Sequence, residues 1–416
     1  MSLCVTDVRI DGMTVGVRCA GGVITHLGPT VGPEPGDSVI PGGGLTLVPG
    51  LVNGHGHAAM TLLRGYGDDL PLMEWLQTRI WPTEGRMTGD DIYWGTRLAC
   101  IEMIRSGTTR FWDMYWFPFD VAGAVVDAGM RATPSQVIVS MDGAPPEARI
   151  DAAADGVDRL AEFGPLVAPS LGPHAIYSVS ENDLRAVAEL AADRELPIQI
   201  HCSETEGEVN DCVAEHGVRP AEYLDRVGLL GPRTVLAHGV WLDDAEFALI
   251  AERGATVVTN PVSNMKLAVG RAFRYPAARA AGVAVGLGTD GAASNNSLDL
   301  IGELKHLALL QKHEHRDPSV MPSGEAWAIA TGRRAPLLGA TPVAVGEPAD
   351  FVLVDADATG LAPAALVDAL VYSGSGAVVQ TVVIAGEVVM RDRVVEGEQE
   401  VRDRAVAAAR RLRDGS

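Results

Sequence analysis

The sequence predicts an α/β protein: a (β/α)8 TIM barrel with a small β-sandwich domain built from both chain ends. The middle of the chain, residues 49–335, alternates apolar strand-like runs with helical stretches about eight times, which is typical of a closed parallel barrel. Residues 1–48 and the region after 350 instead contain short alternating strands broken by glycine and proline. No GxGxxG motif follows an early strand, which argues against a dinucleotide-binding sheet.

The terminal β segments are predicted from their local patterns. The runs VTDVRI, MTVGVRC, GVITHLG and LTLVPG all begin within the first 48 residues, with PEPGD and PGGG as turns. Near the other end, DFVLVDAD precedes VVQTVVIAGEVVMRDRVV, in which Gly386 and Glu387 separate two β-branched runs like a hairpin turn. We therefore expect residues 1–48 and 336–416 to form one composite β-sandwich domain with a C-terminal helix, and residues 49–335 to form the barrel.

The barrel units follow in order along the middle segment. Each pairs a buried-type strand with a helical stretch, and the strand runs are TTRFWDMY, RATPSQVIV, LVAPSLGPH, PIQIHCSET, TVLAHGVWL, ATVVTNP and VAVGLGTDG. The carboxyl ends of such strands form the active-site face of a barrel. Polar residues at those ends are therefore the first candidates for function.

Composition excludes several functional classes. Acidic residues outnumber basic ones by 54 to 33, and the net charge of −21 would repel nucleic acid and anionic membranes. A small-molecule partner fits better. The five cysteines are scattered, without a CxxC pair, so neither a disulfide framework nor a thiolate zinc site is indicated. No basic leader and no apolar run long enough for a bilayer is recognisable, so a cytoplasmic location is the default expectation.

Several histidines and one aspartate fall at predicted strand ends. His55 and His57 in GLVNGHGH are two residues apart on an extended segment, so both rings point to one side. Two hydrogen-bonded histidines would give the same pattern. His201, His238 and Asp290 close three further strands, and together the five side chains predict a site for one divalent metal ion, zinc or iron.

Two nearby residues refine that chemistry. Glu204 follows His201 by three residues, close enough to act as a general acid and base on a water molecule, although a carboxylate at a helix N-terminus is an equal alternative. None of the three lysines lies in LVAPSLGPH, which argues against a metal-bridging modified lysine and for one ion rather than two. A Cys/His nucleophile is disfavoured because Cys202 directly follows His201 on the strand and points to the opposite face.

The segments PGLVNGHGHAAMTLLRG, LGPHAIYS, HCSETEGEV, LAHGVWL, NPVSNMKLAVG and GLGTDGAASNNSLDL resemble the amidohydrolase superfamily. Within it they resemble the branch of methylthioadenosine/S-adenosylhomocysteine deaminases and 5′-deoxyadenosine deaminases. The resemblance covers nearly the whole chain. It implies a hydrolase that acts on the C–N bond of a cyclic amidine and deaminates free adenosine-type nucleosides at C6. It also allows a homo-oligomer.

The resemblance also assigns roles to individual residues. His55, His57, His201 and Asp290 match the metal ligands, His238 matches the histidine that orients the attacking water, and Glu204 matches the proton shuttle; Asp290 would take up the second proton. Glu84 in WPTEGRM matches a residue that grips the ribose hydroxyls, and His174 matches a substrate-contacting histidine. These last two roles come from the resemblance alone.

One departure from the family concerns the 5′ side of the substrate. Relatives that accept S-adenosylhomocysteine can hold its carboxylate with arginines. Arg149 is a plausible match for one of them, while Gln136 replaces the other. An amide lacks the charge and the bidentate fork of arginine, which favours smaller 5′-modified adenosines. Two alternatives stay open: deamination of a free base or pterin (guanine, cytosine, 8-oxopurine) or aryl-chloride hydrolysis on the same fold, and a metal-binding scaffold without catalysis.

Overall fold

The computed structural model describes residues 2–140, 143 and 145–414. Its centre is an eight-stranded parallel sheet whose strands follow one another in chain order. The strands are β6 (Leu51–Gly56), β7 (Thr108–Asp113), β8 (Arg131–Ile138), β9 (Ser170–Pro173), β10 (Ile198–Cys202), β11 (Thr234–His238), β12 (Thr256–Thr259) and β13 (Ala284–Leu287). At the end of β13, the backbone N–H of Asp290 donates to the carbonyl of His55 over 3.1 Å. The first and last strands thus meet, and the predicted barrel is confirmed.

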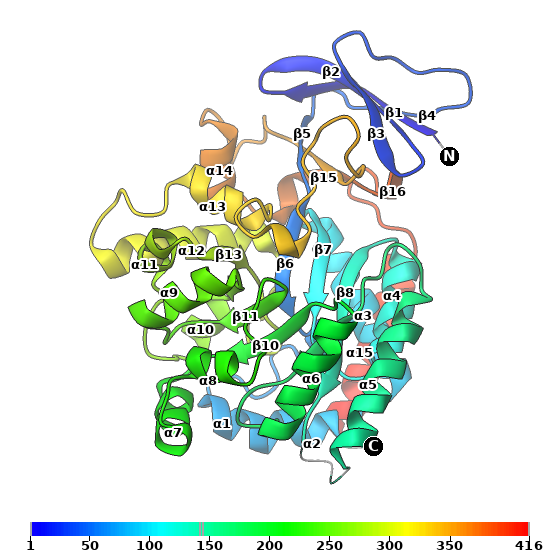
Figure 1. Ribbon diagram of the computed structural model, residues 1–416. Coiled ribbons are helices and arrows are strands. Elements are labelled where there is room, and N and C mark those ends of the chain that lie inside the picture. The colour runs from blue at the N-terminus through cyan, green and yellow to red at the C-terminus, as the bar shows by residue number, and fades with distance from the viewer. Residues whose placement is uncertain (1, 141–142, 144, 415–416) are drawn as a thin grey trace.

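Helices surround this sheet and bury its outer face (Figure 1). The helices after β6 to β13 are α3 (Gly89–Arg105), α4 (Pro118–Ala128), α5 (Pro146–Ala161), α6 (Glu181–Asp193), α7 (Glu206–His216), α8 (Pro220–Arg226), α9 (Asp244–Arg253), α10 (Pro261–Lys266), α11 (Tyr275–Ala281), α12 (Leu300–His315) and α13 (Ser323–Ala330). Every residue of β6, β10 and β11 is buried, as expected for strands covered on both faces. A rigid barrel of this kind fixes the side chains at its carboxyl end.

A segment between β6 and α3 lies over that end of the barrel (Figure 1). It consists of the short helical elements η1 (Ala58–Leu63), α1 (Leu72–Trp75), η2 (Leu76–Ile80) and α2 (Trp81–Glu84). Asp68, between η1 and α1, anchors the segment to the barrel, because Lys266 Nζ lies 2.6 Å from Asp68 Oδ1. The segment brings Trp75 and Glu84 to the pocket described below.

The two ends of the chain share a second, mixed sheet. Its order is β16-β15-β14-β5-β1-β2-β3, with β4 beside β1. These strands are β1 (Ser2–Ile10), β2 (Met13–Ala20), β3 (Val23–Gly28), β4 (Ser38–Pro41), β5 (Thr46–Pro49), β14 (Phe351–Val354), β15 (Val379–Ile384) and β16 (Glu387–Met390). The antiparallel pairing of β5 with β14 joins the two ends directly. The prediction of one β element from both termini is therefore confirmed.

The C-terminal helix α15 (Glu398–Asp414) does not lie on this mixed sheet. It packs against α3 and η1, and Figure 1 shows it beside α3. Its buried residues Val401, Ala405 and Leu412 face the barrel side, and Arg105 Nη1 lies 2.9 Å from Glu398 Oε2. The sequence grouped this helix with the terminal strands, so its position differs from that expectation. The division at residues 48 and 336 stays a prediction.

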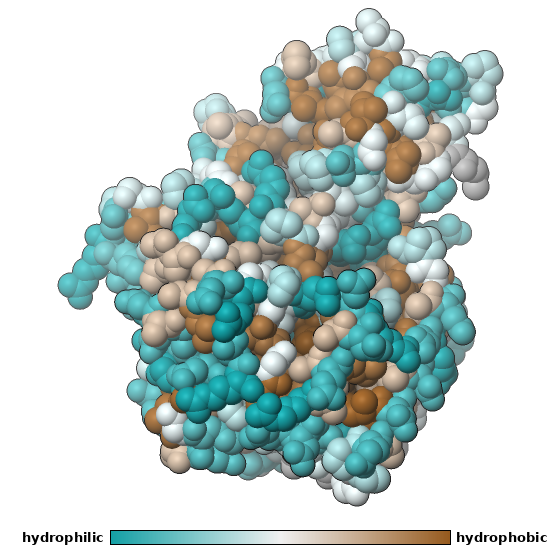
Figure 2. Space-filling model, viewed as in Figure 1, coloured by the Kyte–Doolittle hydropathy of each residue, from teal (hydrophilic) through white to brown (hydrophobic). Residues whose placement is uncertain are grey.

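The surface of the barrel differs from that of the terminal sheet. Figure 2 shows hydrophilic residues over most of the visible barrel and a hydrophobic area on the terminal sheet, where Met13, Val23 and Val39 are exposed. Within the described part of the chain, no helix combines the length and apolar character needed to cross a membrane.

Candidate active site

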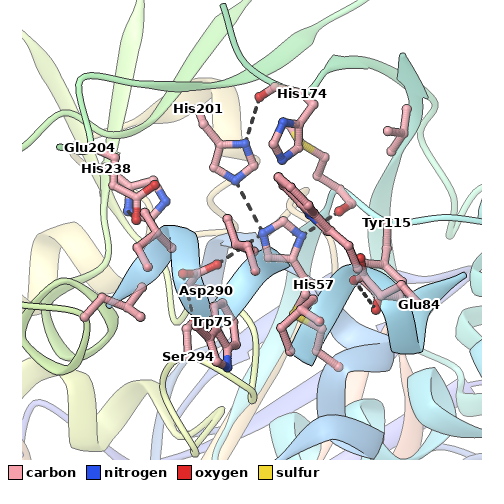
Figure 3. Close-up of a pocket in the computed structure, with 18 of the residues that line it drawn as sticks. His57, Trp75, Glu84, Tyr115, His174, His201, Glu204, His238, Asp290 and Ser294 are labelled. Carbon is pink, nitrogen blue, oxygen red and sulfur yellow. Dashed lines mark hydrogen bonds and ion pairs between the residues drawn. The ribbon is translucent and has the colours of Figure 1, made fainter. Parts of the chain in front are cut away.

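Four histidines and one aspartate meet at the carboxyl end of the barrel, and Figure 3 shows His57, His201, His238 and Asp290 of this cluster. His55 lies in β6 and His57 directly after it, His201 lies in β10, His238 ends β11, and Asp290 follows β13. Asp290 Oδ1 lies 3.2 Å from His57 Nε2 and 3.6 Å from His55 Nε2. The structure thus brings together all five residues that the strand-end pattern singled out.

Two of the imidazole rings are oriented by backbone carbonyls. His57 Nδ1 lies 2.6 Å from the Met114 carbonyl oxygen, and His201 Nδ1 lies 2.8 Å from the His174 carbonyl oxygen. A carbonyl only accepts hydrogen bonds, so Nδ1 must carry the proton in both rings. The lone pairs at Nε2 therefore face the cluster, where the two Nε2 atoms are 3.4 Å apart.

The other two rings are oriented by side-chain amides. His55 Nδ1 lies 2.5 Å from Gln199 Oε1, and His238 Nδ1 lies 2.8 Å from Asn264 Oδ1. Among the described residues, the buried Nε2 atom of His55 has no hydrogen-bond partner. Such outer contacts are typical of histidines that bind a metal ion through Nε2.

The donor set fits a divalent cation. Two overlapping groups of three residues could hold a metal ion. One is His55 with His201 and His238, and the other is His55 with His57 and Asp290. Within each group, the ligand atoms lie within 4.8 Å of one another. Nitrogen and carboxylate ligands of this kind suit zinc. Burial would lower the pKa of His57, but the neighbouring Asp290 carboxylate outweighs burial and raises that pKa to about 9.

Two serines that the sequence did not single out fix the Asp290 carboxylate. Ser263 and Ser294 donate their hydroxyl protons to Oδ2, over 2.6 and 2.9 Å. The other carboxylate oxygen, Oδ1, therefore faces His55 and His57. Burial opposes the charge of Asp290, but His55 and His57 outweigh it and hold its pKa well below the ordinary value. Asp290 and His238 also have positive φ angles of 61° and 72°, which are rare for residues other than glycine.

Glu204 faces the same cluster from the loop between β10 and α7 (Figure 3). Its side chain is buried, and Oε1 lies 3.9 Å from His238 Nδ1. Burial raises the pKa of the Glu204 carboxyl, while His238 opposes that rise. A carboxyl with a raised pKa beside a metal-binding cluster is suited to accept and return a proton.

Glu84 and His174 form the opposite wall of the pocket (Figure 3). Tyr115 donates its phenolic O–H to Glu84 Oε1 over 2.7 Å, and His174 Nδ1 lies 2.9 Å from Ser178 Oγ. Burial raises the pKa of Glu84, and Tyr115 opposes that rise. Tyr115 was not among the candidate residues predicted from the sequence, although it lies only two residues after the end of β7.

Aromatic side chains line much of the pocket: Trp75, Trp81, Trp116, Tyr115 and Tyr177. Trp112 points elsewhere, because its Nε1–H donates to the Leu338 carbonyl over 3.3 Å. A flat heteroaromatic ring fits between walls of this kind.

Arg149 and Gln136 are not brought into the pocket. Arg149 Nη1 lies 2.6 Å from Asp183 Oδ2, and both side chains are almost fully buried. Gln136 faces the outer helices, since its amide packs against Gly156 of α5. Neither side chain is among the residues that line the cavity beside the histidines.

A second cavity of about 700 Å³ opens from the Glu84 wall. It shares Trp81, Glu84, Trp116 and His174 with the first and is otherwise lined by Gly85, Met87, Phe117, Val139 and Ser178. Among these described lining residues there is neither lysine nor arginine. The region beyond Glu84 therefore suits an apolar group.

Comparison with known proteins places these features in a family. The profile of the "Amidohydrolase family" matches residues 46–389. A 5′-deoxyadenosine deaminase of Methanoregula boonei is 48% identical over 362 residues, 85% of this chain and 81% of that protein. A 5-methylthioadenosine/S-adenosylhomocysteine deaminase of Archaeoglobus fulgidus is 42% identical over 358 residues, 85% of this chain and 84% of that protein.

Solved structures agree with this placement. An adenosine deaminase from Xanthomonas campestris, with bound zinc, superposes with a TM-score of 0.90 at 35% identity and covers 100% of this chain and 98% of its own. The atrazine chlorohydrolase TrzN of Arthrobacter aurescens shares the fold, with a TM-score of 0.88 at 20% identity over 98% of this chain and 100% of its own. On the match of the family profile and of these relatives, the chain belongs to the amidohydrolase family.

Proposed function

We propose that this protein is a metal-dependent deaminase of free adenosine-type nucleosides, which it hydrolyses to the inosine analogue and ammonia. The observation that carries the proposal is the convergence of four Nε2-presenting histidines, Asp290 and the buried Glu204 in one aromatic-lined pocket. Relatives more than 40% identical over most of their length act on 5′-deoxyadenosine or on methylthioadenosine and S-adenosylhomocysteine. The proposal extends that substrate class to this chain.

One divalent ion, zinc in preference to iron, would be held by His55, His57, His201 and Asp290. Their donor atoms are preoriented by Gln199, Met114, His174 and two serines. The Xanthomonas campestris structure, which is similar over the whole chain, has bound zinc. When bound, the ion would lower the pKa of a water molecule in the pocket towards neutrality.

The side chains of the pocket would then move the protons. Glu204 takes a proton from the water that attacks C6 of the purine and delivers it to the ring nitrogen N1. His238, fixed through Nδ1 by Asn264, orients that water. Asp290 takes up the second proton and returns it to the amino group, so that the C6–N bond breaks and ammonia leaves. The aromatic walls hold the purine plane while this occurs.

Glu84 would bind the ribose. Tyr115 donates to Oε1, and the carboxylate oxygens have further lone pairs that would accept hydrogen bonds from the ribose hydroxyls. His174 lies on the same wall of the pocket and would contact the sugar. These contacts would distinguish a nucleoside from a free base, which has no ribose.

The apolar cavity beyond Glu84 would receive the 5′ substituent. Because its described lining has no cationic side chain and Arg149 is paired with Asp183, a zwitterionic homocysteine group finds no partner there. Burying unpaired charges is costly. The preferred substrates are therefore 5′-deoxyadenosine and methylthioadenosine rather than S-adenosylhomocysteine.

An ammonia-release assay with zinc-loaded enzyme tests the proposal. The panel is adenosine, 5′-deoxyadenosine, methylthioadenosine, S-adenosylhomocysteine, adenine, guanine and cytosine. We expect the first three to give the highest kcat/KM, and Glu84→Ala to reduce turnover of nucleosides more than that of adenine. Equal or better turnover of the free bases would support the free-base alternative instead. If the protein bound zinc but released no ammonia from any of these compounds, the result would favour the alternative of a metal-binding scaffold without catalysis.

A further inference from the structure

Glu208 binds the backbone of the proposed proton shuttle. Its two carboxylate oxygens accept the backbone N–H groups of two consecutive residues, Ser203 and Glu204, each over 2.8 Å. The Glu208 side chain is buried, and burial raises its pKa to about 7. A buried carboxylate is costly for the fold, so its two short contacts need an explanation.

Comparison with other helices of this protein shows that these contacts are not ordinary helix capping. At the start of α3, Asp91 accepts the N–H of the N-cap residue Thr88, and at the start of α9, Glu246 accepts that of Asp243. This is the usual capping box. Glu208 occupies the same third helical position in α7, but its carboxylate passes the N-cap residue Thr205 and reaches one and two residues further back.

Besides Glu208, the backbone N–H of Trp241 restrains this segment by donating to the Ser203 carbonyl over 2.8 Å. Ser203 has a φ angle of 53°, in the left-handed region that non-glycine residues rarely adopt. In the described structure, no side-chain hydrogen bond fixes the Glu204 carboxyl, whose oxygen lies 3.9 Å from His238 Nδ1. The direction of the Glu204 side chain therefore depends on its backbone.

We propose that Glu208 is a positioning residue, which holds the Ser203–Glu204 backbone so that the Glu204 carboxyl faces the reacting atoms. The inference rests on the proposed function, because it needs Glu204 as the proton carrier. Glu208 itself does not touch the substrate and donates no proton. Its effect is exerted entirely through Glu204.

A double-mutant cycle tests this role. Glu208→Gln keeps the size of the side chain but places an amide NH2 against one of the two N–H groups. A displacement of about 1 Å in an active site can cost about 100-fold in rate, so we expect kcat on 5′-deoxyadenosine to fall 10- to 100-fold while KM changes less than about threefold. In a Glu204→Gln background, the same Glu208→Gln change should reduce kcat less than about twofold, since groups that act as a unit are not additive.

Glu206→Gln is the matched control, because Glu206 is an exposed glutamate in the same helical turn; kcat should remain unchanged. If Glu208→Gln does not fold, Glu208→Asp keeps a buried carboxylate that is too short to reach both N–H groups, and it should still lower kcat more than it raises KM. Zinc content and Tm are measured for every variant.

Three results would overturn the inference: unchanged kcat in both Glu208 variants, an equal loss with and without Glu204, or a loss that only follows zinc content. Failure of the proposed function is separate, because it would appear as absent nucleoside turnover in the unmodified enzyme or as full activity in Glu204→Gln.

Discussion

Tyr115 donates a 2.7 Å hydrogen bond from its phenolic oxygen to Glu84 Oε1. The two residues come from different parts of the fold, since Tyr115 follows β7 while Glu84 ends α2 in the segment over the barrel. Both are largely buried, and Tyr115 favours the charged form of Glu84 against the effect of burial. Tyr115 thereby restrains the direction of the proposed ribose-binding carboxylate and opposes the rise of its pKa.

Removing this hydrogen bond should weaken nucleoside binding. Tyr115→Phe should raise KM for 5′-deoxyadenosine about tenfold, because a hydrogen bond to a charged group contributes about 1.5–3 kcal/mol. Turnover of adenine, which has no ribose, should stay the same. Tyr93→Phe is the control, because Tyr93 donates a similar bond to Asp127 on the outer surface. An equal loss with adenine would show that Tyr115 does not act through ribose binding.

The contact of Gln199 with His55 should set metal affinity. Gln199→Leu removes the acceptor that fixes His55 with Nε2 towards the cluster. Loss of such an outer contact typically costs 10- to 100-fold in metal affinity, which competition with a chromophoric chelator would measure. Gln311→Leu is the control, since Gln311 is also buried and bonds a backbone carbonyl, that of Phe273, away from the histidines. Unchanged zinc affinity in Gln199→Leu would contradict the assigned ring orientation.

The barrel and the metal-binding cluster were predictable because each depends on local pattern. Buried parallel strands appear as short apolar runs, and His201, His238 and Asp290 mark their carboxyl ends, which must meet in a closed barrel. Gln199 and Ser263 gave no such signal, since one lies inside a strand and the other in a helix. Their roles depend on contacts between segments distant in sequence, which periodicity does not report.

The position of Arg149 illustrates the same limit. The family resemblance made Arg149 a plausible match for an arginine that holds a substrate carboxylate, whereas in the structure α6 presents the buried Asp183 to it at 2.6 Å. Likewise, the C-terminal helix has a pattern that predicts a helix, but its position depends on the surfaces of α3 and η1, against which it packs. The sequence pattern predicts whether a segment is a helix or a strand, but it does not predict which other segment it packs against.

Removal of Arg149 should therefore affect stability and not selectivity. Arg149→Met leaves the buried Asp183 carboxylate without this cation, so the free energy of unfolding should fall by about 3 kcal/mol in a denaturant titration. The ratio of kcat/KM for S-adenosylhomocysteine to that for 5′-deoxyadenosine should change less than about twofold. Arg185→Met, which breaks the exposed pair with Glu181 in the same helix, should cost at most about 0.5 kcal/mol. A selective loss on S-adenosylhomocysteine would instead place Arg149 at the substrate.

The pH profile should show the raised pKa of Glu204. The ionised carboxylate is the form that can take a proton from water, so kcat/KM should fall as pH decreases through the Glu204 pKa. Because burial raises that pKa, the acid limb should lie above the ordinary glutamate value of 4.5. Asp290 stays ionised across this range, since its pKa is held well below its own ordinary value. Glu204→Gln should retain zinc, and the pH profile of its residual activity should lack the acid limb. A limb that persists in this variant, with zinc content constant across the pH range, would assign the titration to another group.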